Sequence, residues 1–144
     1  TVDKEISSLY RVKDESIKFY DNHIKAISSF EKKHLISHGV LEKDIIIEKV
    51  ETITIRDLIL KYNFNDFDLL YLDTEGYDGK IVKDFLITTK IRPFIIFEFI
   101  HIGNSLLEEI LYKLHEENYK IIHLEENIFC CPENKKFKID LNIK

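Results

Sequence analysis

Two apolar runs that each end on an acidic residue constrain the fold of this chain more than any other feature. The first run, 68–72, continues into Asp73 and Glu75, and the second, 93–97, ends at Glu98. Buried parallel strands read as short apolar runs, and ligand sites of open α/β sheets lie at the carboxyl ends of such strands. Two neighbouring strands of this kind would place their acids in one crevice, where charges cost free energy unless they bind something. The pattern therefore predicts a parallel sheet with a carboxylate site at its edge.

The size and composition of the chain fit one soluble domain. Its 144 residues are 44% hydrophobic and 33% charged, and no apolar run approaches the roughly 20 residues that a membrane-spanning helix needs. The formal net charge is -5, with Lys and Arg scattered among the acids, so we expect neither a nucleic-acid partner nor a membrane span. The only cysteines, Cys130 and Cys131, are neighbours, which favours two reduced thiols and a cytoplasmic location. The chain has no Met and begins at Thr1, from which we expect an excised or cleaved piece of a longer protein.

Hydrophobic periodicity predicts the order of the helices and strands. In the leading segment, 1–44, we expect a helix that starts near Asp14, carries apolar residues at helical spacing and ends at Gly39. From 45 to 144 the pattern predicts strand, helix, strand, helix, strand, helix and a two-stranded hairpin. This order is typical of an α/β domain whose parallel strands are joined by right-handed crossovers. The expected strands are 45–54, 68–73, 93–98, 120–124 and 128–131, and the expected helices are 55–62 with Thr54 as N-cap, 80–86, and 105–117 with Asn104 or Ser105 as N-cap.

Several motifs, taken as a set, resemble one enzyme family. They are Val50-Glu51-Thr52-Ile53-Thr54-Ile55-Arg56-Asp57-Leu58, Asp68-Leu69-Leu70, Asp73-Thr74-Glu75-Gly76-Tyr77-Asp78, Arg92-Pro93 and Phe97-Glu98. Over about residues 50–131 this set resembles the carboxyl-terminal half of the FkbM-type methyltransferases. The resemblance implies a partial Rossmann-like sheet of the class I methyltransferases whose amino-terminal strands are missing. It also implies S-adenosylmethionine as cofactor and methyl transfer to a hydroxyl oxygen of a small-molecule natural product or a glycan.

The chain departs from that family at two points. The family usually carries a Lys or a similar polar residue where this chain has Tyr71, and its glycine-rich cofactor loop lies upstream of the matching residues. None of the four glycines of this chain stands in a strand-to-helix nucleoside-binding pattern. We therefore leave the cofactor-binding residues unassigned and expect these 144 residues to be inactive by themselves. A sheet without its amino-terminal strands has a bare apolar edge, so we also expect homo-oligomers that form through this edge.

The candidate catalytic residues are Asp73, Glu75, Glu98 and His101. Transfer of a methyl group to oxygen requires an acceptor hydroxyl that loses its proton. By analogy with metal-dependent O-methyltransferases of the same general fold, Asp73 and Glu98 would hold a Mg²⁺ ion that lowers the pKa of the acceptor. Without a metal, Glu75 or His101 would act as the base. We assign no chemistry to the other histidines, which we expect at surface or packing positions: His23, His34, His38, His115 and His123.

Other readings of the same residues stay open. Asp73 would also serve as a cap of the turn that follows it, and Glu75 as an acceptor for backbone N–H groups around Gly76. Clustered Asp and Glu side chains bind magnesium or manganese in enzymes that hydrolyse phosphoesters. A half-domain with an open sheet edge would instead be a non-catalytic interaction module. Cofactor binding distinguishes the methyltransferase from the hydrolase, and a stable oligomer whose acids tolerate substitution would mark the interaction module.

Overall fold

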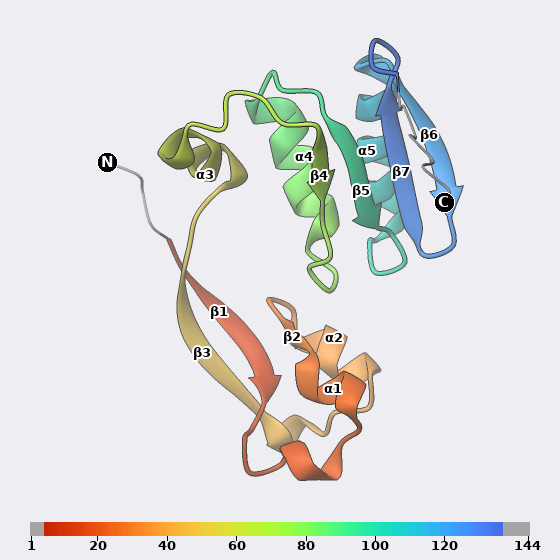
Figure 1. Ribbon diagram of the computed structural model, residues 1–144. Helices are drawn as coiled ribbons and strands as arrows, with labels where there is room; N and C mark the ends of the chain where they lie inside the picture. Colours follow the sequence, from red (N-terminus) through yellow and green to blue (C-terminus); the bar gives the residue numbers. More distant parts are fainter. Residues whose placement is uncertain (1–4, 137–144) are drawn as a thin grey trace, which may run out of the picture.

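Short helices and strands alternate along this computed structural model, which describes residues 5–136 (Figure 1). The strands are β1 (Glu5–Val12), β2 (Ser28–Ser29), β3 (Ile45–Thr52), β4 (Leu69–Tyr71), β5 (Phe94–Glu98), β6 (Tyr119–Leu124) and β7 (Asn127–Pro132). The α-helices are α1 (Asn22–Ala26), α2 (Lys32–Ser37), α3 (Ile55–Tyr62), α4 (Asp78–Thr88) and α5 (Asn104–Glu116), and the 3-10 helices are η1 (Ile17–Phe19) and η2 (Glu42–Asp44). The strands form two sheets, in the orders β2-β1-β3 and β4-β5-β7-β6. The predicted α/β class is therefore confirmed, but as two sheets rather than one.

The first sheet is antiparallel and joins the start of the chain to β3. β1 and β3 pair along their full length, from Glu5 opposite Thr52 to Val12 opposite Ile45. The predicted strand from residue 45 is confirmed, whereas its place in the parallel sheet is wrong. The physical reason is that β1 has the same eight-residue length as β3 and supplies hydrogen-bond partners along all of it.

The single helix predicted from Asp14 to Gly39 is wrong. The apolar residues in this segment do form a small buried cluster, but short elements carry them. Asp21 begins a new helix because its side chain accepts the N–H of Ile24. Just before it, Tyr20 has extended backbone, and its hydroxyl donates to Asp44, 24 residues further on. These contacts prevent the single continuous helix that the periodicity predicted. The buried cluster is Val12, Ile24, Ile27, Leu35 and Val40.

The second sheet follows the prediction closely. β4 and β5 run parallel, β7 pairs antiparallel with β5, and β6 and β7 form the predicted hairpin. The Thr54 hydroxyl accepts the N–H of Asp57 and so caps α3, as predicted. The predicted cap of α5 is wrong, because Gly103 occupies the N-cap position and makes no side-chain cap.

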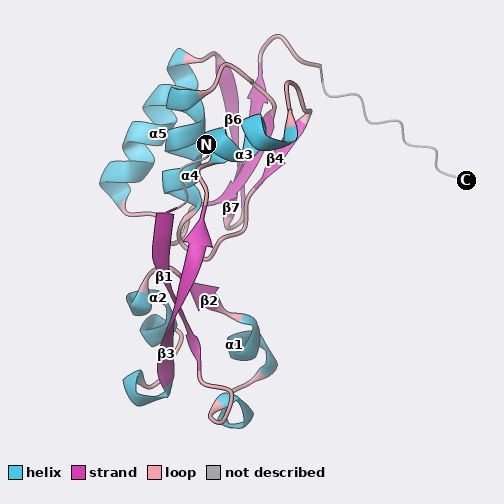
Figure 2. Ribbon diagram, turned by 90° about the vertical axis from the view of Figure 1, so that its left-hand side faces the viewer, coloured by secondary structure: helices cyan, strands magenta, loops and turns pink. Residues whose placement is uncertain are grey.

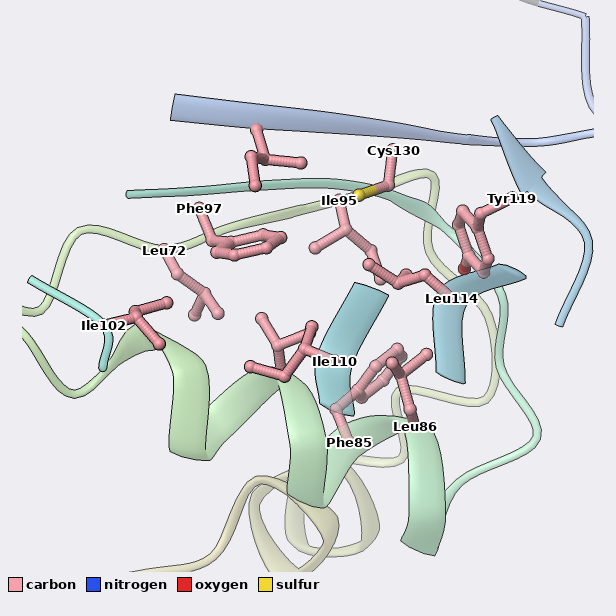
Figure 3. Packing of buried hydrophobic residues seen from close by; sticks show 12 residues of the cluster. Leu72, Phe85, Leu86, Ile95, Phe97, Ile102, Ile110, Leu114, Tyr119 and Cys130 are labelled. Carbon is pink, nitrogen blue, oxygen red and sulfur yellow. The ribbon is translucent and has the colours of Figure 1, made fainter. Parts of the chain in front are cut away.

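The main core lies between this sheet and the helices α4 and α5. Figure 2 shows α4 and α5 together on one side of the strands. In Figure 3, Ile95 and Phe97 point from β5 toward Phe85 and Ile110 of the helices. These four side chains are at most 1% exposed, so apolar burial holds β5 in place and aligns its carboxyl end.

The helices and the two cysteines bear on the expectations from composition. Within residues 5–136, no helix has the length and apolar character that crossing a membrane requires. Cys130 and Cys131 are free cysteines, as predicted, and the first is buried in β7. Burial raises the pKa of the Cys130 thiol to about 12, so this cysteine packs as a small apolar group.

Candidate functional site

The carboxyl ends of β4 and β5 bring together three of the four predicted catalytic residues. The parallel register places Tyr71 opposite Ile96, so the residues after the two strands emerge at the same edge. One side-chain ligand atom from each of Glu75, Glu98 and His101 lies within 4.8 Å of the others. The acidic strand ends therefore do converge on one site.

Asp73 lies beside this group and does not belong to it. Its side chain is exposed, and with Thr74 and Glu75 it lines an open hollow of about 370 Å³. The opposite wall of the hollow comes from the first sheet and its neighbours, namely Leu9, Ala26, Ser28 and Phe30. The leading segment thus borders the same site as the strand ends.

The turn after β4 is held in shape by Asp78, which the sequence analysis named only as the last residue of the motif that begins at Asp73. Asp78 is fully buried at the start of α4, and its Oδ2 accepts both the N–H and the hydroxyl of Thr74, at 3.1 and 2.7 Å. Inside this turn, Glu75 and Gly76 have positive φ angles of 51° and 95°. A glutamate in this conformation costs about 1 kcal/mol, a strain typical of functional sites. The turn therefore fixes the direction of the Glu75 side chain.

Glu98 is the most perturbed acid of the site. Its side chain is 17% exposed, and among the described residues its buried Oε2 has no hydrogen-bond partner. Burial raises the pKa of Glu98 to about 7, and the negative charges of Glu75, Asp78 and Asp73 add to the effect. A carboxyl group with this pKa both takes and releases a proton near neutral pH.

Two histidines of the leading segment reach the same site, although sequence reasoning gave them no role. His34 Nε2 lies 2.9 Å from Glu75 Oε2, and its ring centroid is 4.5 Å from those of His38 and His101. His34 and His38 are four residues apart, a spacing that places two side chains on the same side of a helix. This spacing is the sequence signal that could have indicated a histidine pair. The contact between α2 and the turn at Glu75 could not be predicted from the sequence, because the two segments are about 40 residues apart.

His101 lies between the carboxylates and the other two imidazoles. Its Nε2 is 3.8 Å from Glu98 Oε2. Burial lowers the pKa of His101, and the nearby His34 and His38 lower it further. Ser29 strengthens the contact between the two halves of the chain, because its hydroxyl donates to the Glu75 carbonyl at 3.1 Å. The site is therefore built jointly by both sheets.

A comparison with models of protein families shows the family of this chain. The model of the methyltransferase FkbM domain matches residues 4–121. This chain belongs to the FkbM methyltransferase family. The match begins at residue 4, so the leading segment is part of the family domain. The predicted resemblance over residues 50–131 is therefore corrected: the matched region is 4–121 and includes most of the leading segment. No curated protein and no solved structure matches the chain.

Membership in this family supports methyltransferase activity and, in general, the use of S-adenosylmethionine. Glu75 links the two features of this edge, because it both lines the hollow and lies within the group of Glu98 and His101. Two of the four glycines lie where β4 leads into α4: Gly76 in the turn and Gly79 in the first turn of the helix, and they do not form the G-x-G-x-x-G pattern of dinucleotide-binding turns.

Proposed function

We propose that this FkbM-family protein is an S-adenosylmethionine-dependent O-methyltransferase that acts on a hydroxyl group of a glycan or a small natural product. The observation that carries the proposal is Glu98, a largely buried carboxyl group at the end of β5 with a pKa of about 7. An acceptor hydroxyl must lose its proton during transfer, and a base with a pKa near the working pH does this most effectively.

The roles of the side chains follow from their positions. When bound, S-adenosylmethionine supplies an electrophilic methyl group. Glu98 would accept the proton of the acceptor hydroxyl, and the neighbouring His101 and Glu75 would pass it toward solvent. Asp73, at the open hollow, would position the acceptor by a hydrogen bond from a second hydroxyl. Sugars and polyhydroxylated natural products offer such neighbouring hydroxyl groups.

We further propose that these 144 residues by themselves do not hold the cofactor tightly. The support is chemical, since glycine-rich turns bind the nucleoside in Rossmann-like enzymes and this sequence contains none. A Mg²⁺ ion held by Asp73 and Glu98 stays a prediction. The ligand atoms within 4.8 Å of one another come from Glu75, Glu98 and His101, and Mg²⁺ disfavours the histidine nitrogen of this group.

The test is transfer of a tritium-labelled methyl group from S-adenosylmethionine to hydroxyl acceptors, by the natural polypeptide with any residues that flank Thr1–Lys144. Asp73→Asn should abolish transfer and leave the fold unchanged in circular dichroism, because Asp73 is exposed. Glu108→Gln, at an exposed position on α5, is the matched control and should retain activity. Turnover of Asp73→Asn at the wild-type rate would refute its proposed role.

A second candidate, an interaction module, has one observation in its favour. β4 is an edge strand, and Leu69 and Tyr71 on it are 51% and 59% exposed. Exposed apolar edges pair with other chains. We therefore propose homo-oligomers through β4 as a property that accompanies the enzymatic role.

A further inference from the structure

We propose that His34, His38 and His101 form a binding site for a transition-metal ion of the Zn²⁺ class. One ring nitrogen from each histidine lies within 4.8 Å of the other two. Ligand nitrogens around a tetrahedral zinc ion, each about 2.1 Å from the metal, are roughly 3.4 Å apart. A pair of ring nitrogens that lies 4.8 Å apart would therefore need to approach by about 1.4 Å, and closer pairs by less, which side-chain rotations provide. This proposal concerns metal binding and does not depend on the proposed methyltransferase activity.

His34 on α2 and His38, the C-cap of this helix, each use one ring nitrogen in a hydrogen bond. His38 Nδ1 lies 2.9 Å from the carbonyl oxygen of His34 and, as a donor, leaves Nε2 with its lone pair. His34 Nε2 lies 2.9 Å from Glu75 Oε2 and, as a donor, leaves Nδ1 with its lone pair. Metal-binding histidines almost always donate their second ring N–H to a carbonyl or carboxylate in this way. These two hydrogen bonds orient both rings, and in each ring the other nitrogen is the one that would bind the metal.

The surroundings have space and charge for a cation. Gly76 lies next to two of the rings, since a Cβ atom at this position would be 3.9 Å from His34 Nδ1 and 3.5 Å from His101 Cβ. Glu75 bonds to the His34 ring, and Glu98 Oε2, which has no hydrogen-bond partner within residues 5–136, is 3.8 Å from His101 Nε2. The carboxyl groups of Glu75 and Glu98 beside the three imidazoles would contribute negative charge toward a divalent ion.

The nature of the ligands selects the metal. Imidazole nitrogens suit zinc, copper and nickel, whereas magnesium and calcium take oxygen ligands. The proposed site is therefore distinct from a magnesium site at Asp73 and Glu98. Packing of the three histidine rings without a metal is the alternative, and it predicts no specific binding.

The experiment is a titration of the metal-free chain with ZnCl₂ by calorimetry and with CoCl₂ by visible absorption. We expect one ion per chain, cobalt bands of a site with nitrogen ligands, and thermal unfolding at a higher temperature when zinc is present. His38→Ala and His101→Ala should each weaken binding at least 10-fold. The matched controls are His115→Ala and His123→Ala, both at exposed positions outside the site, and they should bind as the wild type does.

His34 is buried, so its removal can disturb the fold. Glu75→Gln is therefore the second variant, since it keeps the side-chain size and should weaken zinc binding about 10- to 100-fold by removing the carboxylate that orients His34. Circular dichroism without metal verifies that each variant is folded. Absence of zinc binding in the wild type, or equal binding by His38→Ala, His101→Ala and the controls, would overturn the proposal.

Discussion

Substitution of Glu98 by Gln should stabilise the protein at alkaline pH. The folded protein holds Glu98 at a pKa of about 7, against 4.5 for the ordinary side chain. A carboxyl group whose pKa is raised on folding binds its proton more tightly in the folded state, so stability falls as pH rises from 4.5 to 7 and then levels off. This shift corresponds to about 3 kcal/mol at pH 8.5. Gln carries no charge at any pH and removes the penalty.

The assay is urea unfolding of the wild type and of Glu98→Gln at pH 4.5 and pH 8.5, with a chelator present. We expect the free energy of unfolding of the variant, relative to the wild type, to increase by about 3 kcal/mol between the two pH values. Most of this increase should occur between pH 5 and 7. Glu108→Gln, the exposed control on α5, should show no such increase. The reasoning is refuted if the stability difference between Glu98→Gln and the wild type is the same at both pH values.

The remaining predictions concern the core and the sheet edge. Tyr119→Phe should lower the free energy of unfolding by about 1 to 2 kcal/mol, because the Tyr119 hydroxyl donates to the buried carbonyl of Pro93 at 2.9 Å; Tyr112→Phe, at a residue that is 65% exposed, should change it by less than about 0.5 kcal/mol. Equal effects of the two substitutions in urea unfolding would contradict this. Light scattering should show oligomers of the chain that Leu69→Lys shifts toward monomer, because a charge on edge strand β4 opposes pairing. A monodisperse wild-type monomer would argue against the open edge as an interface.

The second sheet was predictable because its signals are local. The apolar run before Asp73, the cap at Thr54 and the short hairpin link each depend on residues near one another in sequence. The convergence of Glu75 and Glu98 followed from a general property of parallel sheets, whose strands end at the same edge.

The first sheet was not predictable in the same way because its contacts are distant in sequence. β1 carries apolar residues at half of its eight positions, but they do not alternate regularly with polar ones, and its pairing with β3 makes it a strand. The bond from Tyr20 to Asp44 likewise overrides a helical pattern. The role of His34 depends on the approach of α2 to the turn at Glu75, which no local pattern encodes.

The central claim, that this FkbM-family chain serves S-adenosylmethionine-dependent methyl transfer, is tested most directly by calorimetric titration with S-adenosylmethionine. The titration is made on the 144-residue chain and on the natural polypeptide with any residues that flank it. We predict binding by the natural polypeptide and none, or very weak binding, by the 144 residues alone. Failure of the natural polypeptide to bind S-adenosylmethionine would contradict the account.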